Sequence, residues 1–173
     1  MEKTSEILIY LMKCSLQNTK PEEAPLARAD LEALLRLARA HSVSAMVCMA
    51  LEKTAIFAGA DDAVKKHWRE AKNKAIRKNM LLDAERAAIM MQLESAGIWH
   101  MPLKGSILKD WYPKPGMREM ADNDILFDPS ERKRVRGIFQ SRGYKIVSFG
   151  KGNHDEYEKP PLYHFEMHIS LFH

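Results

Sequence analysis

The sequence is poor in cysteine and contains no long apolar run. Its two cysteines, Cys14 and Cys48, lie in helical patterns, far from any spacing typical of a metal site. Two lone thiols are typical of a reducing compartment, so we expect a cytoplasmic protein. The apolar run at residues 7–12 follows acidic residues and is too short for a signal peptide. No segment is long enough to span a membrane, so we expect no membrane partner.

Glycine and proline are absent from residues 61–96. Apolar residues recur there at helical spacing, and Gly97 follows at the position where left-handed backbone ends many helices. The pattern predicts a single helix capped by Asp61 or Asp62, on the order of 50 Å long at 1.5 Å per residue.

Shorter helices are expected before this long one, at residues 5–17, from Asp30 onwards and at residues 43–53. The first half of the chain is therefore predicted to be a helical bundle. The apolar stripe expected on the helix after Asp30 is Leu31, Leu34, Leu35 and Ala38.

The chain is mildly basic, with a formal net charge of +4 and a pI near 9.0, which fits an anionic ligand without requiring one. A basic run on the predicted long helix is opposed only by Glu70. It could be a track for nucleic acid or triphosphate, or a solvated helix face. No aromatic residues interleave on the exposed side, which favours the solvated face. The basic run consists of Lys65, Lys66, Arg69, Lys72, Lys74, Arg77 and Lys78.

After Gly97 the apolar period changes from the helical repeat to the alternation of β-strands. The alternation predicts an α+β fold, in which an N-terminal helical bundle precedes a small mixed sheet with helices on one face. We therefore expect a helical domain, residues 1–96, and an α+β core, residues 97–173. Strands are expected at residues 98–103, 121–127, 144–149, 154–158 and 163–171, and helices at residues 106–112 and 129–141.

Two motifs in the second half carry chemical meaning. Lys104-Gly105-Ser106 joins a strand to a helix, and such a turn leaves backbone N–H groups and a hydroxyl free to face an anion. Asp122 and Asp124 stand two residues apart in a strand, so their side chains share one face. Two carboxylates on one face repel each other unless a cation lies between them. Such a pair usually binds Mg²⁺ together with a phosphate chain.

The last expected strand alternates strictly between apolar and polar residues. Because its apolar face belongs in the core, Glu166 stands on the opposite face, with His164 and His168 on either side. A carboxylate there, beside the aspartates, would complete a three-acid metal site; the simpler alternative is an exposed strand residue. The residues expected to face the core are Tyr163, Phe165, Met167, Ile169 and Leu171.

Lys104-Gly105-Ser106 followed by Asp122-x-Asp124 resembles the nucleotidyltransferase signature of the polymerase-beta-like superfamily. More closely, the segments LKGSIL, YPKPGMREMADND and HFEMHISL resemble the bacterial uncharacterised nucleotidyltransferase family over most of residues 93–173. That family places a helical segment before its catalytic core. Here Asn123 replaces the apolar residue usually found between the two acids, and residues 107–121 form a somewhat longer spacer than in compact members of the superfamily.

The resemblance implies transfer of a nucleoside monophosphate from an NTP to an acceptor, with release of pyrophosphate. It implies that Asp122, Asp124 and Glu166 are both the catalytic and the metal-binding residues, with Mg²⁺, or alternatively Mn²⁺, as the cofactor. The acceptor is left open: a small molecule, a protein or RNA would fit. The residues that would bind the nucleotide are Lys104, Gly105, Ser106 and Arg118.

Other interpretations fit the same residues. A catalytically inactive nucleotidyltransferase fold could bind nucleotides or partners, and a basic helical nucleic-acid binder could carry a vestigial domain. Arg118 fits a salt bridge to Glu119 or Asp122 as well as a phosphate contact. Asp155 and four histidines suggest zinc, although their spacing matches no zinc pattern. These histidines are His154, His164, His168 and His173.

Members of the family it resembles usually continue past His173. We therefore expect a core that is incomplete at its C-terminus, with exposed apolar surface that promotes homo-oligomers.

Overall fold

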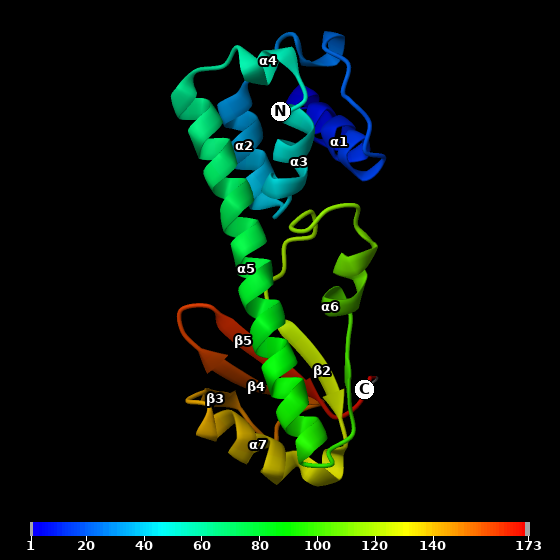
Figure 1. Ribbon diagram of the computed structural model, residues 1–173, viewed down its shortest axis with the longest axis vertical. Coiled ribbons are helices and arrows are strands. Elements are labelled where there is room, and N and C mark those ends of the chain that lie inside the picture. Colours follow the sequence, from blue (N-terminus) through cyan, green and yellow to red (C-terminus); the bar gives the residue numbers. More distant parts are fainter. Residues whose placement is uncertain (1, 172–173) are drawn as a thin grey trace. The chain divides into compact units, whose positions relative to one another are not determined.

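The computed structural model describes residues 2–171 and has an α+β architecture, with helices first and a mixed five-stranded sheet after them, as predicted (Figure 1). None of the helices among these residues is long and apolar enough to cross a membrane. His173 lies outside the described residues. The helices of the first part are α1 (Glu2–Leu16), the 3-10 turn η1 (Ala24–Leu26), α2 (Leu31–Ala40), α3 (Ser44–Leu51), α4 (Ala55–Ala58) and α5 (Asp62–Ser95).

The second part begins after Gly97, whose backbone is left-handed with φ of +69° and ends α5 as predicted. Its helical elements are α6 (Gly105–Leu108), η2 (Lys109–Trp111), η3 (Pro129–Glu131) and α7 (Arg132–Ser141). Its strands are β1 (His100–Pro102), β2 (Asn123–Phe127), β3 (Lys145–Ser148), β4 (His154–Lys159) and β5 (Tyr163–His168).

The chain divides into two compact units. Unit 1 consists of Met1–Asn79 and Lys109–Glu119, and unit 2 consists of Met80–Leu108 and Met120–His173. Helix α5 therefore contributes its first half to unit 1 and its second half to unit 2.

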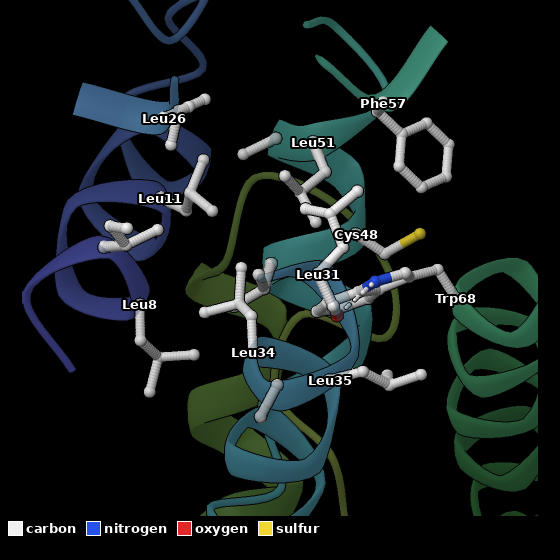
Figure 2. Packing of buried hydrophobic residues seen from close by; sticks show 14 of the residues in the cluster. Leu8, Leu11, Leu26, Leu31, Leu34, Leu35, Cys48, Leu51, Phe57 and Trp68 are labelled. Carbon is white, nitrogen blue, oxygen red and sulfur yellow. Dashed lines mark hydrogen bonds between the residues drawn. The ribbon is translucent and has the colours of Figure 1, made fainter. Parts of the chain in front are cut away.

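Unit 1 is a helical bundle with a leucine-rich core (Figure 2). Asp30 caps α2, because its carboxylate accepts the backbone N–H groups of Glu32 and Ala33 at 3.0 and 2.9 Å. Trp68 of α5 is fully buried, and its indole N–H donates to the Leu31 carbonyl at 3.1 Å. A buried ring with a satisfied N–H ties α5 to α2. The predicted stripe of α2 is buried in full: Leu31, Leu34, Leu35 and Ala38.

The segment Lys109–Glu119 packs within unit 1. The carboxylate of Glu119 accepts the backbone N–H of Ala45 at 3.2 Å, in the first turn of α3. Gly116 has φ of +84°, and a Cβ there would lie 2.5 Å from Cγ1 of Ile76. Only glycine fits this position. Much of the long spacer between the two motifs is thus a segment docked on the helical unit.

Unit 2 is built on a mixed sheet with strand order β1-β2-β5-β4-β3. The adjacent strands β2 and β5 are parallel, and the other neighbouring strands are antiparallel. Helices α5 and α7 supply the apolar residues that pack with the sheet, so the helices lie on one face, as predicted. The core is formed by Ile89 and Leu93 of α5, Val135 and Phe139 of α7, and Ile125, Phe127, Tyr157, Phe165 and Met167 of the strands.

Several predicted boundaries were too long. Strand β5 ends at His168 instead of Leu171, and Leu171 is 52% exposed, so the core stripe does not extend to it. The helix expected at residues 106–112 is a single α-turn followed by the 3-10 turn η2. Pro113 disfavours helical backbone at the residue before it, which shortens this element.

Asn123 lies on the core face of β2, as the alternation requires, and it is fully buried. Its side-chain oxygen accepts a hydrogen bond from Arg86 at 3.0 Å, and its amide nitrogen donates to the Leu82 carbonyl at 3.3 Å. Both partners belong to α5. The polar residue between the two acids is therefore a satisfied core residue that joins β2 to the helix.

Candidate functional site

The pairing of β2 with β5 places the second aspartate beside the glutamate. Asp124 and Glu166 are register partners in the parallel pair, and Asp122 immediately precedes β2. Because side chains alternate along a strand, these acids lie on the face opposite the buried Ile125 and Phe165. We call this the acid face; it carries Asp122, Asp124, Glu166, His164 and His168.

The acids and histidines of this face lie within reach of one metal ion or a pair of ions. Ligand atoms of Asp122, His164 and Glu166 all lie within 4.8 Å of one another. The same limit holds for Asp124, Glu166 and His168. Glu166 belongs to both groups. Carboxylate and imidazole groups are the side chains that hold divalent cations in proteins, so the donor set fits a metal site.

Asp124 is buried and has two cationic or polar neighbours. The ammonium of Lys104 lies 2.9 Å from Oδ1 of Asp124, and Nε2 of His168 lies 2.9 Å from the same oxygen. Burial alone would raise the pKa of the Asp124 carboxyl, but the hydrogen bonds from Lys104 and His168 hold that pKa below its ordinary value. The bond to Asp124 in turn raises the pKa of the Lys104 ammonium. The two shifts agree, and both favour a charged pair.

The turn at Lys104-Gly105-Ser106 differs in part from the prediction. Ser106 is buried, and its backbone N–H and its hydroxyl both donate to the Leu103 carbonyl, at 3.3 and 2.6 Å. The hydroxyl proton is therefore used within the turn instead of facing an anion. Lys104 has left-handed backbone with φ of +47°, which is unusual for a residue with a side chain. This backbone forms the sharp turn from β1 into α6.

Arg118 belongs to unit 1, whereas the acid face belongs to unit 2. The structure shows no salt bridge from Arg118 to Glu119 within the described residues; Glu119 instead accepts the Ala45 N–H. The Nε atom of Arg118 is buried without a hydrogen-bond partner in the described part of the chain. Its contact with nucleotide phosphates stays a prediction.

Strand β4 extends the acid face with Glu156 and His154, whose places beside the acids the sequence did not predict. Glu156 is the register partner of Glu166, and His154 is the register partner of His168. The carboxylate of Glu156 lies 3.3 Å from Nε2 of His154 and 3.7 Å from Nε2 of His164. The alternation of β4 alone could have placed them on one face, but which face required the register with β5.

Asp155 belongs to neither ligand group among the described residues, and the zinc interpretation was wrong for it. It is fully buried on the core side of β4, where Arg132 donates to both of its oxygens at 2.7 and 2.6 Å. Its carboxylate also accepts the Gly150 N–H at 2.8 Å. Both carboxylate oxygens of Asp155 therefore accept hydrogen bonds within the fold and do not face the acid face.

The basic run of α5 divides into a paired and an unpaired part. Acids in unit 1 pair with its first four members; Glu52, for example, lies 2.6 Å from Lys72 and 3.7 Å from Arg69. Lys65 pairs with Asp62, and Lys66 pairs with Glu70. Over the part of the chain that the structure describes, Lys74, Arg77 and Lys78 have no carboxylate partner. Much of the run is therefore a neutralised helix face.

A family model described as Uncharacterised nucleotidyltransferase matches residues 27–173. The match spans both motifs, Glu166 and most of the helical part. Neither a curated protein nor a solved structure matches the chain.

Proposed function

The chain belongs to the uncharacterised nucleotidyltransferase family, and from this membership we infer a general role in nucleotidyl transfer. On that premise we propose that unit 2 transfers a nucleoside monophosphate from an NTP to an acceptor nucleophile and releases pyrophosphate. The observation that carries the proposal is the register of β2 with β5, which sets Asp124 beside Glu166 and next to Asp122 on one sheet face.

Asp122, Asp124 and Glu166 are the residues we assign to a divalent cation, Mg²⁺ or alternatively Mn²⁺. When bound, such a cation neutralises charge on the triphosphate and acts as a Lewis acid. The acids fit it because three carboxylates at this spacing repel one another without a positive partner. Lys104 supplies part of that positive charge, at 2.9 Å from Asp124.

The residues of the chain have separate parts in the proposed transfer. Lys104 exchanges its bond to Asp124 for a phosphate oxygen, and Gly105 of the turn brings backbone close to the phosphates. Glu166 accepts the proton of the acceptor hydroxyl while that oxygen bonds to the α-phosphorus and the bond to the leaving pyrophosphate breaks. Catalysis then depends chiefly on positioning and on neutralisation of developing charge.

The proposal is tested first by binding. Thermal unfolding of the full chain is followed with each of the four NTPs, with Mg²⁺ or Mn²⁺ and without metal. We expect at least one NTP to raise the unfolding temperature only when metal is present, by mass action on the native state. Asp124→Asn should abolish this shift. Absence of any metal-dependent shift in the wild-type chain would contradict the proposal.

Transfer is tested second, with NTPs labelled at the α-phosphate and three acceptor pools: total RNA, mixed proteins and small hydroxyl compounds. We expect label in one pool, and its loss in Asp124→Asn. Metal-dependent binding without transfer to any pool would favour the inactive nucleotide-binding module instead. Salt-dependent binding to RNA or DNA that persists in Asp124→Asn would favour the nucleic-acid binder.

A further inference from the structure

Two imidazoles of the acid face are directed at its carboxylates. His168 follows Glu166 by two residues on β5, and only 8% of its side chain is exposed. Its Nε2 atom lies 2.9 Å from Oδ1 of Asp124 and 3.4 Å from Oε2 of Glu166. The His168 ring is about nine-tenths buried, and its nitrogen faces two carboxylate oxygens. Its position therefore suits a polar contact or a metal bond as well as packing.

His164 occupies the corresponding place at the other end of the face. It precedes Glu166 by two residues, and a ring nitrogen lies within 4.8 Å of carboxylate oxygens of both Asp122 and Glu166. The face therefore contains two ligand groups that share Glu166. Each group has one aspartate and one histidine of its own.

The separations around His168 match those of atoms that bind one ion. Ligands at 2.0 to 2.2 Å from an octahedral ion lie about 3 Å apart when they are adjacent, and about 3.4 Å apart around a tetrahedral one. Nε2 of His168 lies 2.9 Å from the Asp124 oxygen and 3.4 Å from the Glu166 oxygen, and both separations lie within this range. The competing account is a hydrogen bond from His168 to Asp124 that only holds the carboxylate in place.

Imidazole ligands change which cation a site prefers. Mg²⁺ selects oxygen ligands and water, whereas first-row transition ions accept imidazole nitrogen readily. Mn²⁺ shares the preference of Mg²⁺ for carboxylate oxygen, and as a first-row transition ion it also accepts imidazole nitrogen. We propose, building on the metal-dependent nucleotidyl transfer proposed above, that His164 and His168 are metal ligands and that the site binds Mn²⁺ more tightly than Mg²⁺.

The test compares the two ions directly. Calorimetric titration of the full chain with MnCl₂ and with MgCl₂, without nucleotide, gives both dissociation constants. We expect Mn²⁺ to bind at least about tenfold more tightly, following the ligand preference of the two ions. Pulsed electron paramagnetic resonance of the Mn²⁺ complex should show couplings to imidazole nitrogen.

Glutamine variants separate ligation from positioning. The amide nitrogen of Gln can replace the N–H of His168 toward Asp124, but it does not replace an imidazole ligand. His164→Gln and His168→Gln should each weaken Mn²⁺ binding roughly tenfold, weaken Mg²⁺ binding much less and reduce the nitrogen couplings. His154→Gln is the matched control, because its ring is 5.2 Å from that of His168 yet belongs to neither ligand group.

The outcomes distinguish this inference from the proposed function. Equal affinity for both ions, or Mn²⁺ binding without nitrogen couplings, overturns the inference and leaves metal-dependent nucleotide binding intact. Nitrogen couplings reduced in both Gln variants support the inference even when no NTP binds, and that result would count against the proposed function alone. If neither ion binds, both fail.

Discussion

Asp124 on β2 and Glu166 on β5 are direct partners in a parallel strand pair. One register therefore decides the composition of the whole acid face, because a slip of one residue would turn every side chain of β5 to the opposite side. The register is held by burial: Phe165 and Met167, on either side of Glu166, are both fully buried. The apolar residues of the strand thus position its polar ones.

The Asn123–Arg86 contact should be a stabilising core interaction. Asn123→Ala removes the acceptor of a partly buried guanidinium and leaves the Leu82 carbonyl without that donor, so we expect a loss of about 1–3 kcal/mol in unfolding free energy. Urea unfolding of Asn123→Ala, Arg86→Ala and the double variant measures the coupling, expected at roughly 0.5–1.5 kcal/mol. Asn73→Ala, an exposed asparagine of the same helix, should be nearly neutral. Additive losses would show that the two side chains do not act together.

The Arg132–Asp155 pair should stabilise unit 2 far more than an exposed pair does. Arg132→Met leaves the fully buried Asp155 carboxylate without its guanidinium, and breaking such a pair costs about 3–5 kcal/mol. Arg134→Met removes an exposed pair with Glu131, in which the arginine side chain is 55% exposed. We expect this variant to lose under about 1 kcal/mol of unfolding free energy. Denaturant unfolding of the two variants makes the comparison. Similar losses in both would mean that Asp155 is adequately solvated in the folded protein.

Much of the fold could be predicted because its signals are local. The helical stripe after Asp30, the absence of Gly and Pro from α5, and the change of period at Gly97 are all readable within one element. The partner of Asn123 could not be predicted, because Arg86 reaches it across the packing of α5 on the sheet.

The candidate site could be predicted only as far as strand alternation allows. Alternation placed Glu166 on one strand face with His164 and His168, and the family resemblance joined Glu166 alone to Asp122 and Asp124. The bond of Lys104 to Asp124 and the position of Glu156 depend on turn geometry and register, which no spacing along the chain encodes. The expected homo-oligomer stays a prediction.

Cys48 should be unreactive until unit 1 unfolds. It is fully buried, and burial raises the pKa of its thiol from 9.0 to about 12. At pH 8 the native protein should therefore react with iodoacetamide far more slowly than the urea-unfolded chain, as followed by mass spectrometry. The raised pKa also makes the folded state hold a proton that the unfolded state releases, so stability should fall as pH rises from 9.0 towards 12. Cys48→Ala removes the contribution of Cys48 to this pH dependence, and rapid alkylation of native Cys48 would contradict the prediction.

Lys104 should act in opposite directions on the two proposed ligands. The Lys104 ammonium lies 2.9 Å from Asp124, and 59% of the lysine side chain is exposed. This ammonium competes with a divalent cation for the Asp124 carboxylate. Lys104→Met should therefore tighten binding of Mn²⁺ alone by up to about fivefold, since exposed pairs contribute at most about 1 kcal/mol. The same variant should weaken NTP binding, because the phosphates lose a cation.

Lys133→Met is the control: it changes the net charge equally at an exposed position of α7 and should alter neither dissociation constant. Calorimetric titration with Mn²⁺, and then with NTP at saturating Mn²⁺, gives both values. Weaker binding of both ligands in Lys104→Met would show that Lys104 supports the turn instead of competing for Asp124.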